Sequence, residues 1–163
     1  MKIAAVTAME KETRYRQVLE KASAMLHGET DSIAAMATIS SLLAGEFPYY
    51  FWTGFYRMID GGLVIGPYQG TPGCLRIALD RGVCGAAASS GETLIVDDVH
   101  DFPGHIACDS RSQSEIVVPV KDADGQVLAV LDVDSVEKAS FDAVDQEGLE
   151  KIVALLMSVN DVD

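Results

Sequence analysis

The sequence predicts an α+β domain in which helices from both ends of the chain pack on a mostly antiparallel sheet. Stretches with apolar residues at helical spacing lie before residue 46 and after residue 141, and short β-branched and aromatic runs fill the middle. Two of these runs flank an Asp-Gly turn, which is typical of a hairpin. Helices gathered at the ends around such a sheet define the α+β class.

Two helices are expected before the sheet. The first covers residues 9–27 with Gly28 as its stop, and its apolar stripe is Val18, Leu19, Ala22, Met25 and Leu26. The second has Thr30 or Asp31 as N-cap and Gly45 past its end. Its stripe contains Ile33, Met36, Ile39 or Ser40, and Leu43.

The middle of the chain is expected to form strands around one small helix. Strands are predicted at residues 49–58, 63–70, 74–79 and 93–99, and Gly82 and Gly91 bound the helix. A hairpin follows over residues 114–135, with its tip at residues 122–125. A last helix covers residues 142–159, with Asp142 or Ser140 as cap, and buries Leu149, Ile152, Val153 and Leu156.

Composition excludes several classes of function. A net charge of −13 repels phosphate backbones and anionic lipid, so nucleic acid and membrane surfaces are not expected partners. No apolar run reaches the length of a membrane helix, and no convincing leader precedes the first helix. We therefore expect a cytoplasmic protein with one domain over residues 1–163, of which residues 1–27 form an N-terminal helical extension.

The three cysteines, Cys74, Cys84 and Cys108, are the first candidates for chemistry. Nine residues separate the first two and 23 separate the last two, whereas zinc sites use close cysteine pairs. His105 lies near Cys108 and is compatible with two ligands on one loop, but the pattern as a whole does not predict a metal. The apolar stretch around Cys84 favours inert burial.

Cys108 has the surroundings of a nucleophile. Its neighbours His105, Asp109 and Arg111 are polar, and a thiol near a cation has a lowered pKa. Cys74 lies in a Pro-Gly loop, so the two form a plausible attacking and resolving pair. Such a pair requires Cα atoms within about 7 Å of each other.

Three acids form the second candidate group. Asp132 and Asp134 alternate at the end of an apolar strand and therefore share a face, and the hairpin brings Glu115 close to them. Acids at strand ends often do no more than face solvent. Convergence of all three would raise at least one pKa and leave a carboxyl able to donate a proton near neutral pH.

Aromatic residues form the third candidate group. Trp52 and Tyr56 are four residues apart, so on one strand they face the same side. They can wall a pocket for a small apolar group, or simply pack in the core. For Phe51 and Phe55 we expect ordinary core packing.

These residues lie in segments that carry a family resemblance. The segments are "YYFWTGFYRM", the stretch from "LVIGPYQG" to "SEIVVPV", and "VLAVLDVDS", with the cysteines in the contexts "GCLRI", "GVCG" and "HIACD". From about residue 30 to the end, the chain resembles the free methionine-(R)-sulfoxide reductases, which are built on a GAF domain. We find no departure at a motif position.

The resemblance implies a thiol mechanism. Cys108 takes the place of the catalytic cysteine, whose thiolate attacks the sulfur of free methionine sulfoxide and becomes a sulfenic acid. Cys74 matches the resolving cysteine that forms a disulfide with it, and Cys84 matches an auxiliary cysteine. Thioredoxin then reduces the disulfide, so no bound cofactor is expected.

The resemblance also assigns the pocket. Trp52 and Tyr56 match the aromatic pair that holds the substrate methyl group. Glu115, Asp132 and Asp134 match the carboxylates that bind the polar end of the substrate and assist protonation of its oxygen, with the division of these duties left open. A homodimer in which the N-terminal helix packs on a partner subunit is expected.

Two other functions compete with this one. The chain is alternatively a GAF sensor module that binds a small ligand without turnover, or an adaptor stabilised by zinc. We expect no output domain in these 163 residues, and a binding pocket has no need of three cysteines. Both points favour the enzyme.

Overall fold

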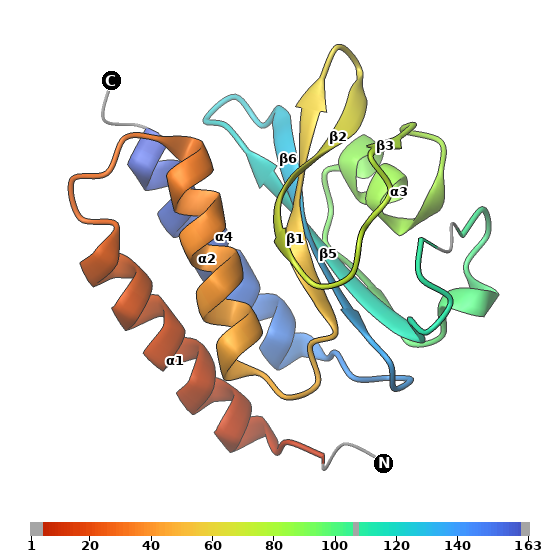
Figure 1. The fold of residues 1–163 in the computed structure, drawn as a ribbon, viewed down its shortest axis with the longest axis horizontal. Coiled ribbons are helices and arrows are strands. Elements are labelled where there is room, and N and C mark those ends of the chain that lie inside the picture. Colours follow the sequence, from red (N-terminus) through yellow and green to blue (C-terminus); the bar gives the residue numbers. More distant parts are fainter. Residues whose placement is uncertain (1–4, 106–107, 161–163) are drawn as a thin grey trace.

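A six-stranded sheet with helices on both faces forms the molecule (Figure 1). The computed structural model describes residues 5–105 and 108–160, so Ile106 and Ala107 of the "HIACD" motif lie outside the described residues. Helices α2 (Ser32–Glu46) and α4 (Ala143–Asn160) cover one face, and α1 (Ala8–Met25) lies outside them. The short α3 (Gly82–Ser90) covers the other face.

The strands follow the order β3-β2-β1-β6-β5-β4, and every neighbouring pair is antiparallel. The expected α+β class with an antiparallel central sheet is therefore confirmed. A 3₁₀ turn, η1 (Val99–Asp101), follows β4. The strand bounds are β1 Trp52–Ile59, β2 Gly62–Gln69, β3 Arg76–Ile77, β4 Leu94–Val96, β5 Ser114–Lys121 and β6 Val127–Ser135.

Local signals set the helix starts. Asp31 caps α2 through the Ala34 N–H at 2.9 Å, so Thr30 is not the cap. Asp142 accepts from the Val144 N–H at 3.0 Å at the start of α4, whereas the Ser140 hydroxyl donates to Ser135. The expected end of α2 before Gly45 is wrong, because the helix continues to Glu46.

The buried helix stripes differ from expectation only near the α1–α2 connection. Leu149, Ile152, Val153 and Leu156 of α4 are all buried, as predicted. Met25 is 63% exposed and Ile33 is 44% exposed, so their assignment to the core is wrong. Met25 is the last residue of α1 and Ile33 is the second residue of α2, so both lie beside the connection between these helices, where the helical spacing continues but the side chains face solvent.

Three strands are shorter than expected. β1 begins at Trp52 because Tyr49 and Tyr50 pack against other rings instead of extending the ladder, with the Tyr50 and Phe47 ring centroids 4.6 Å apart. β3 contains only two residues, since the preceding Cys74 is held by a disulfide. β4 contains three residues and gives way to η1.

Strand parity divides the apolar residues into two cores. Phe55, Ile116 and Leu131 point toward α2 and α4 and belong to the larger core. Trp52, Tyr56, Val117 and Val130 point toward α3 and form a smaller core with Cys84. Since side chains alternate along a strand, the same strands both anchor the helices and supply the face under α3.

A buried polar network joins α1 to α4. Asp145 is fully buried, and its carboxylate accepts from the Lys11 amine at 2.6 Å and the Tyr15 hydroxyl at 2.7 Å. The Tyr49 hydroxyl donates to the same carboxylate. Removal of one partner from such a network leaves the other charge buried without compensation.

Within the described ranges, 5–105 and 108–160, no helix is at once long enough and apolar enough to cross a membrane.

The Asp145 network predicts a large loss of stability on neutralisation. Asp145→Asn should lower the free energy of unfolding by about 3 kcal/mol, because Lys11 then remains buried without its closest counter-charge. Denaturant titration measures the change. Glu147→Gln is the matched control, since it removes the exposed Glu147–Lys151 pair of the same helix and should cost no more than about 0.5 kcal/mol. Equal losses in the two variants would contradict this assignment.

Candidate active site

A pocket opens between α3, the sheet and two loops. Its walls include residues of β1, α3, β5 and β6, residues 71–73, and the loop around Cys108. Counted out to its open mouth, the space is about 570 Å³, within the range of small-molecule sites. Seven of the eight predicted site residues line it: Trp52, Tyr56, Cys84, Cys108, Glu115, Asp132 and Asp134.

The remaining predicted residue, Cys74, joins the pocket through a disulfide to Cys108. The Cα atoms are 5.5 Å apart, inside the limit of about 7 Å for a disulfide-bonded pair. Cys108 is exposed and Cys74 is half-buried. The disulfide therefore lies at the mouth of the pocket, where another thiol can reach it.

The hairpin β5–β6 brings the three acids together. Glu115 pairs directly with Asp134, and Asp132 lies two residues earlier on the same face. Glu115 is 6% exposed and Asp132 is 5% exposed, so for these two the solvent-facing interpretation is wrong. Asp134 is half-buried. Among the described residues, no lysine or arginine nitrogen lies within 4.0 Å of any of these carboxyl groups.

Burial and mutual repulsion make the acids hold protons. Burial, followed by repulsion from Asp132 and Asp134, raises the pKa of Glu115 well above its ordinary value. Burial likewise raises the pKa of Asp134. Burial also raises the pKa of Asp132, but hydrogen bonds from Glu115, Cys84 and Asp134 oppose that shift. The cluster therefore favours one anion at Asp132 beside protonated neighbours.

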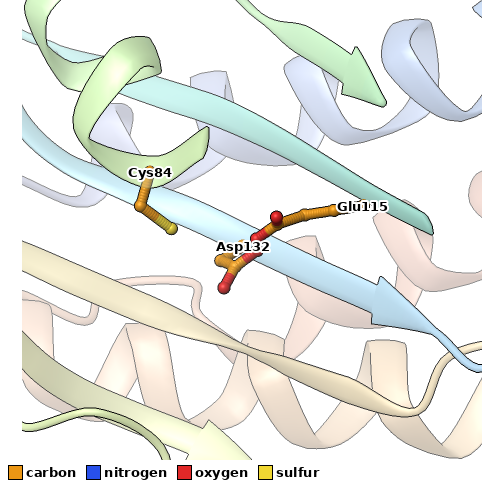
Figure 2. Close-up of side chains that lie close together, drawn as sticks. All are labelled: Cys84, Glu115 and Asp132. Atoms are coloured by element: carbon orange, nitrogen blue, oxygen red, sulfur yellow. The ribbon is translucent and has the colours of Figure 1, made fainter. Parts of the chain in front are cut away.

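Cys84 lies against this cluster. Figure 2 shows its side chain extending from α3 toward the carboxyl groups of Glu115 and Asp132, and the three candidate ligand atoms all lie within 4.8 Å of one another. Burial, followed by the charge of Asp132, raises the pKa of this thiol. The expected burial of Cys84 is confirmed, since only 4% of it is exposed, but its contacts are with acids as well as apolar groups.

Close packing holds α3 near the sheet. A Cβ atom at Gly85 would lie 2.7 Å from the Ala78 carbonyl oxygen and 2.9 Å from that of Leu79. Any larger residue at this position would push the helix away from the preceding loop. Gly85 thus allows the approach that places Cys84 over the acids.

The aromatic wall forms as the four-residue spacing predicts. The Trp52 and Tyr56 rings stack with centroids 5.7 Å apart, and both side chains are buried. The Tyr68 ring also stacks with the Trp52 ring, with centroids 5.0 Å apart. Phe55 packs in the larger core as expected. Phe51 packs against the smaller core, but it is only half-buried and also lines the pocket.

The sequence pattern did not indicate the role of Thr71, and it did not show that the charge of Arg111 is already paired. Thr71 accepts the Trp52 indole N–H through its carbonyl at 2.8 Å and donates its hydroxyl to Asp109 at 2.9 Å. It therefore connects the loops of the two disulfide cysteines, and no sequence pattern pointed to it. Arg111 forks onto Asp109 at 3.0 and 2.8 Å and lies over the Phe51 ring, so this cation is already paired.

His105 also lines the pocket beside this loop. Burial, followed by the neighbouring His100, lowers its pKa. The imidazole is therefore neutral near neutral pH. The sequence identified His105 only as a polar neighbour of the Cys108 thiol. The charge of the His105 imidazole depends on burial and on His100, which the spacing around Cys108 does not reveal.

Comparison with known proteins agrees with this geometry. The family model described as "GAF domain" matches residues 33–159. The protein named Free methionine-R-sulfoxide reductase of Escherichia coli (strain K12) is 41% identical over 151 residues, which cover 93% of this chain and 91% of that protein. Protein YtsP of Bacillus subtilis (strain 168) is 46% identical over 149 residues, 90% of this chain and 91% of that protein.

A solved structure from Neisseria meningitidis, described as free methionine-R-sulfoxide reductase in complex with its substrate, has 39% identity and a TM-score of 0.89. The match covers 99% of this chain and 95% of that one, so it includes both loops and all four helices. On this evidence the chain belongs to the GAF domain family, and within it to the group that contains the free methionine-R-sulfoxide reductases.

Proposed function

We propose that this protein reduces free methionine-(R)-sulfoxide to methionine through a thiol mechanism. The observation that carries the proposal is the Cys74–Cys108 disulfide at the mouth of a pocket that holds protonated carboxyl groups. Relatives with that activity in their names, matched over nearly the whole chain, support it. A sensor module would use the pocket but would have no use for the disulfide.

The pocket complements each part of a free amino acid sulfoxide. The S-methyl group packs against the stacked Trp52 and Tyr56 rings. Asp132, at which hydrogen bonds from neighbouring groups oppose the rise in pKa that burial causes, accepts the ammonium group. The substrate carboxylate lies at the N-terminus of α3, whose N-cap residue Arg81 makes no side-chain cap and lines the pocket.

Peptide-bound methionine sulfoxide lacks both terminal charges. It gains nothing from the anion at Asp132 or from the start of α3, and its flanking chain has to fit between the two loops that line the pocket. Selectivity for the free amino acid therefore follows from charge recognition at both ends of the substrate.

The first chemical step oxidises Cys108. The thiolate attacks the sulfoxide sulfur, and the protonated oxygen leaves as water from the sulfonium intermediate that links the two sulfurs. Water then attacks the Cys108 sulfur, the S–S bond breaks, and the products are methionine and the Cys108 sulfenic acid. The sulfoxide oxygen is a poor leaving group until it is protonated, and protonated Glu115 is the donor that the buried cluster supplies. Glu115 therefore acts as acid and Asp132 as the ammonium site, with Asp134 in support.

The second step closes the disulfide. The Cys74 thiol attacks the sulfur of the Cys108 sulfenic acid and water leaves, which gives the disulfide seen in the structure. A dithiol of the thioredoxin class then attacks this exposed bond, and both protein thiols are restored. We further propose that this cycle operates in the cytoplasm, in a homodimer that uses the outer face of α1.

Cys108→Ser should abolish turnover, because a hydroxyl at this position neither attacks the sulfoxide nor forms a disulfide. The measurement is methionine produced from free methionine-(R)-sulfoxide with thioredoxin or dithiothreitol as reductant. The (S) epimer and a peptide-bound sulfoxide serve as substrate controls and should not react. Full activity in the variant would disprove the assignment of Cys108.

Cys74→Ser should separate the two reductants. Without the resolving thiol the Cys108 sulfenic acid has no intramolecular partner, so turnover with thioredoxin should fall by about tenfold or more, whereas dithiothreitol reduces the sulfenic acid directly. Rates with the two reductants measure the split. Equal losses with both would count against a resolving role for Cys74.

Glu115→Gln should lower activity while it raises stability. The raised pKa means that the folded state loses stability as pH rises from the ordinary carboxyl value toward the raised one, and glutamine removes that loss. At neutral pH the melting temperature should therefore increase, while the rate falls about 100-fold without the acid. In the wild type, the rate should decline as pH rises through the raised pKa. A lower melting temperature in the variant would indicate a purely structural role.

A further inference from the structure

The buried face beneath α3 contains more ligand atoms than the proposed reaction uses. Cys84 supplies a thiol, and Glu115 and Asp132 each supply a carboxyl oxygen, all within 4.8 Å of one another (Figure 2). The reaction proposed above gives Cys84 no step. We propose that Cys84, Glu115 and Asp132 form a binding site for a single Zn²⁺ ion, and that zinc bound there blocks the pocket.

An unpartnered oxygen points to a ligand at this position. Asp132 is 5% exposed, and among the described residues its Oδ1 atom has no hydrogen-bond partner. An orphaned carboxyl oxygen at this depth is costly unless a cation or a donor satisfies it. The groups that donate to the Asp132 carboxyl are Glu115, Cys84 and Asp134, which are acids themselves and leave Oδ1 without a partner. In the described part of the chain no lysine or arginine comes within 4.0 Å, so a cation that neutralises the cluster has to come from outside.

The ligand set selects the metal. A thiolate is a soft ligand that Mg²⁺ and Ca²⁺ avoid, whereas Zn²⁺ accepts sulfur together with carboxylate oxygen. Around tetrahedral zinc, neighbouring ligand atoms lie roughly 3.5 Å apart. The present spacing of at most 4.8 Å therefore requires an inward adjustment of roughly 1 Å. Three protein ligands leave a fourth position open toward the pocket.

Zinc binding exchanges protons for a metal ion and involves no redox step. Zinc displaces the proton of the Cys84 thiol and the proton shared among the carboxyl groups, and these protons go to solvent. The bound ion then neutralises the repulsion that keeps these groups protonated. Occupation of the site rests only on this geometry. The resulting inhibition rests on the proposed function, because zinc takes the two carboxyl groups assigned to the ammonium group and to proton donation.

The disulfide makes the test specific. In the oxidised protein Cys74 and Cys108 are bonded to each other, so Cys84 is the only cysteine left to coordinate a metal. Titration of oxidised protein with ZnCl₂ by calorimetry should show one Zn²⁺ per chain. Cys84→Ser and Glu115→Gln should each weaken binding at least tenfold. Cys84→Ala checks that the serine result reflects the lost ligand rather than altered folding, which circular dichroism monitors.

A cobalt titration identifies the ligand directly. Co²⁺ bound to the wild-type oxidised protein should show thiolate-to-metal charge-transfer absorption in the near ultraviolet, and Cys84→Ser should remove it. His100→Ala is the matched control. The His100 imidazole lies 2.9 Å from Asp98 and near His105, so these three residues are the obvious alternative zinc site at the surface. This variant should bind zinc as the wild type does.

The results separate this site from the proposed function. Zinc should raise the apparent KM for free methionine-(R)-sulfoxide without a matching fall in kcat, and the sulfoxide should weaken zinc binding in return. Zinc binding in a protein without reductase activity would leave the site standing and remove the proposed function. Wild-type protein that binds no zinc, unchanged affinity in Cys84→Ser, or lost affinity in His100→Ala would overturn the site.

Discussion

The clustering of the buried Glu115 and Asp132 with the half-buried Asp134 is the constraint on which the rest of this structure depends. Each carboxyl group loses hydration, and none has a lysine or arginine partner within the described residues. A cluster of this kind persists only when protons are shared or an external ligand compensates the charge. The uncompensated charge that makes this cluster costly to bury is therefore also what prepares it to bind a cationic group and to donate a proton.

The remainder of the fold offsets that cost on the opposite face of the same strands. Phe55, Ile116, Leu131 and Val133 alternate with the pocket residues and bury completely against α2 and α4. The Lys11–Asp145 pair shows the contrasting arrangement, in which a buried acid has a cation and two tyrosine hydroxyls as partners. One sheet thus separates a stabilising core from a strained site, a division that strand parity makes possible.

Redox chemistry is located on loops, while recognition is located on strands. Cys74 and Cys108 lie in irregular segments that contain glycine and are open to solvent, so they can approach a partner and separate again. The Thr71–Asp109 hydrogen bond joins these two segments and also connects them to Trp52. The reactive sulfur is therefore positioned relative to the aromatic wall even though it lies outside the regular elements.

The sequence by itself determined whatever depends on local spacing. The hairpin tip sets the register that pairs Glu115 with Asp134, and the four-residue spacing puts Trp52 and Tyr56 on one face, because side-chain direction follows parity along a strand. Tertiary structure alone decided that Cys84 lies against Asp132, that Phe51 lines the pocket, that Met25 is exposed, and that Lys11 is buried beside Asp145. These features depend on packing between segments up to 134 residues apart, which no local pattern encodes.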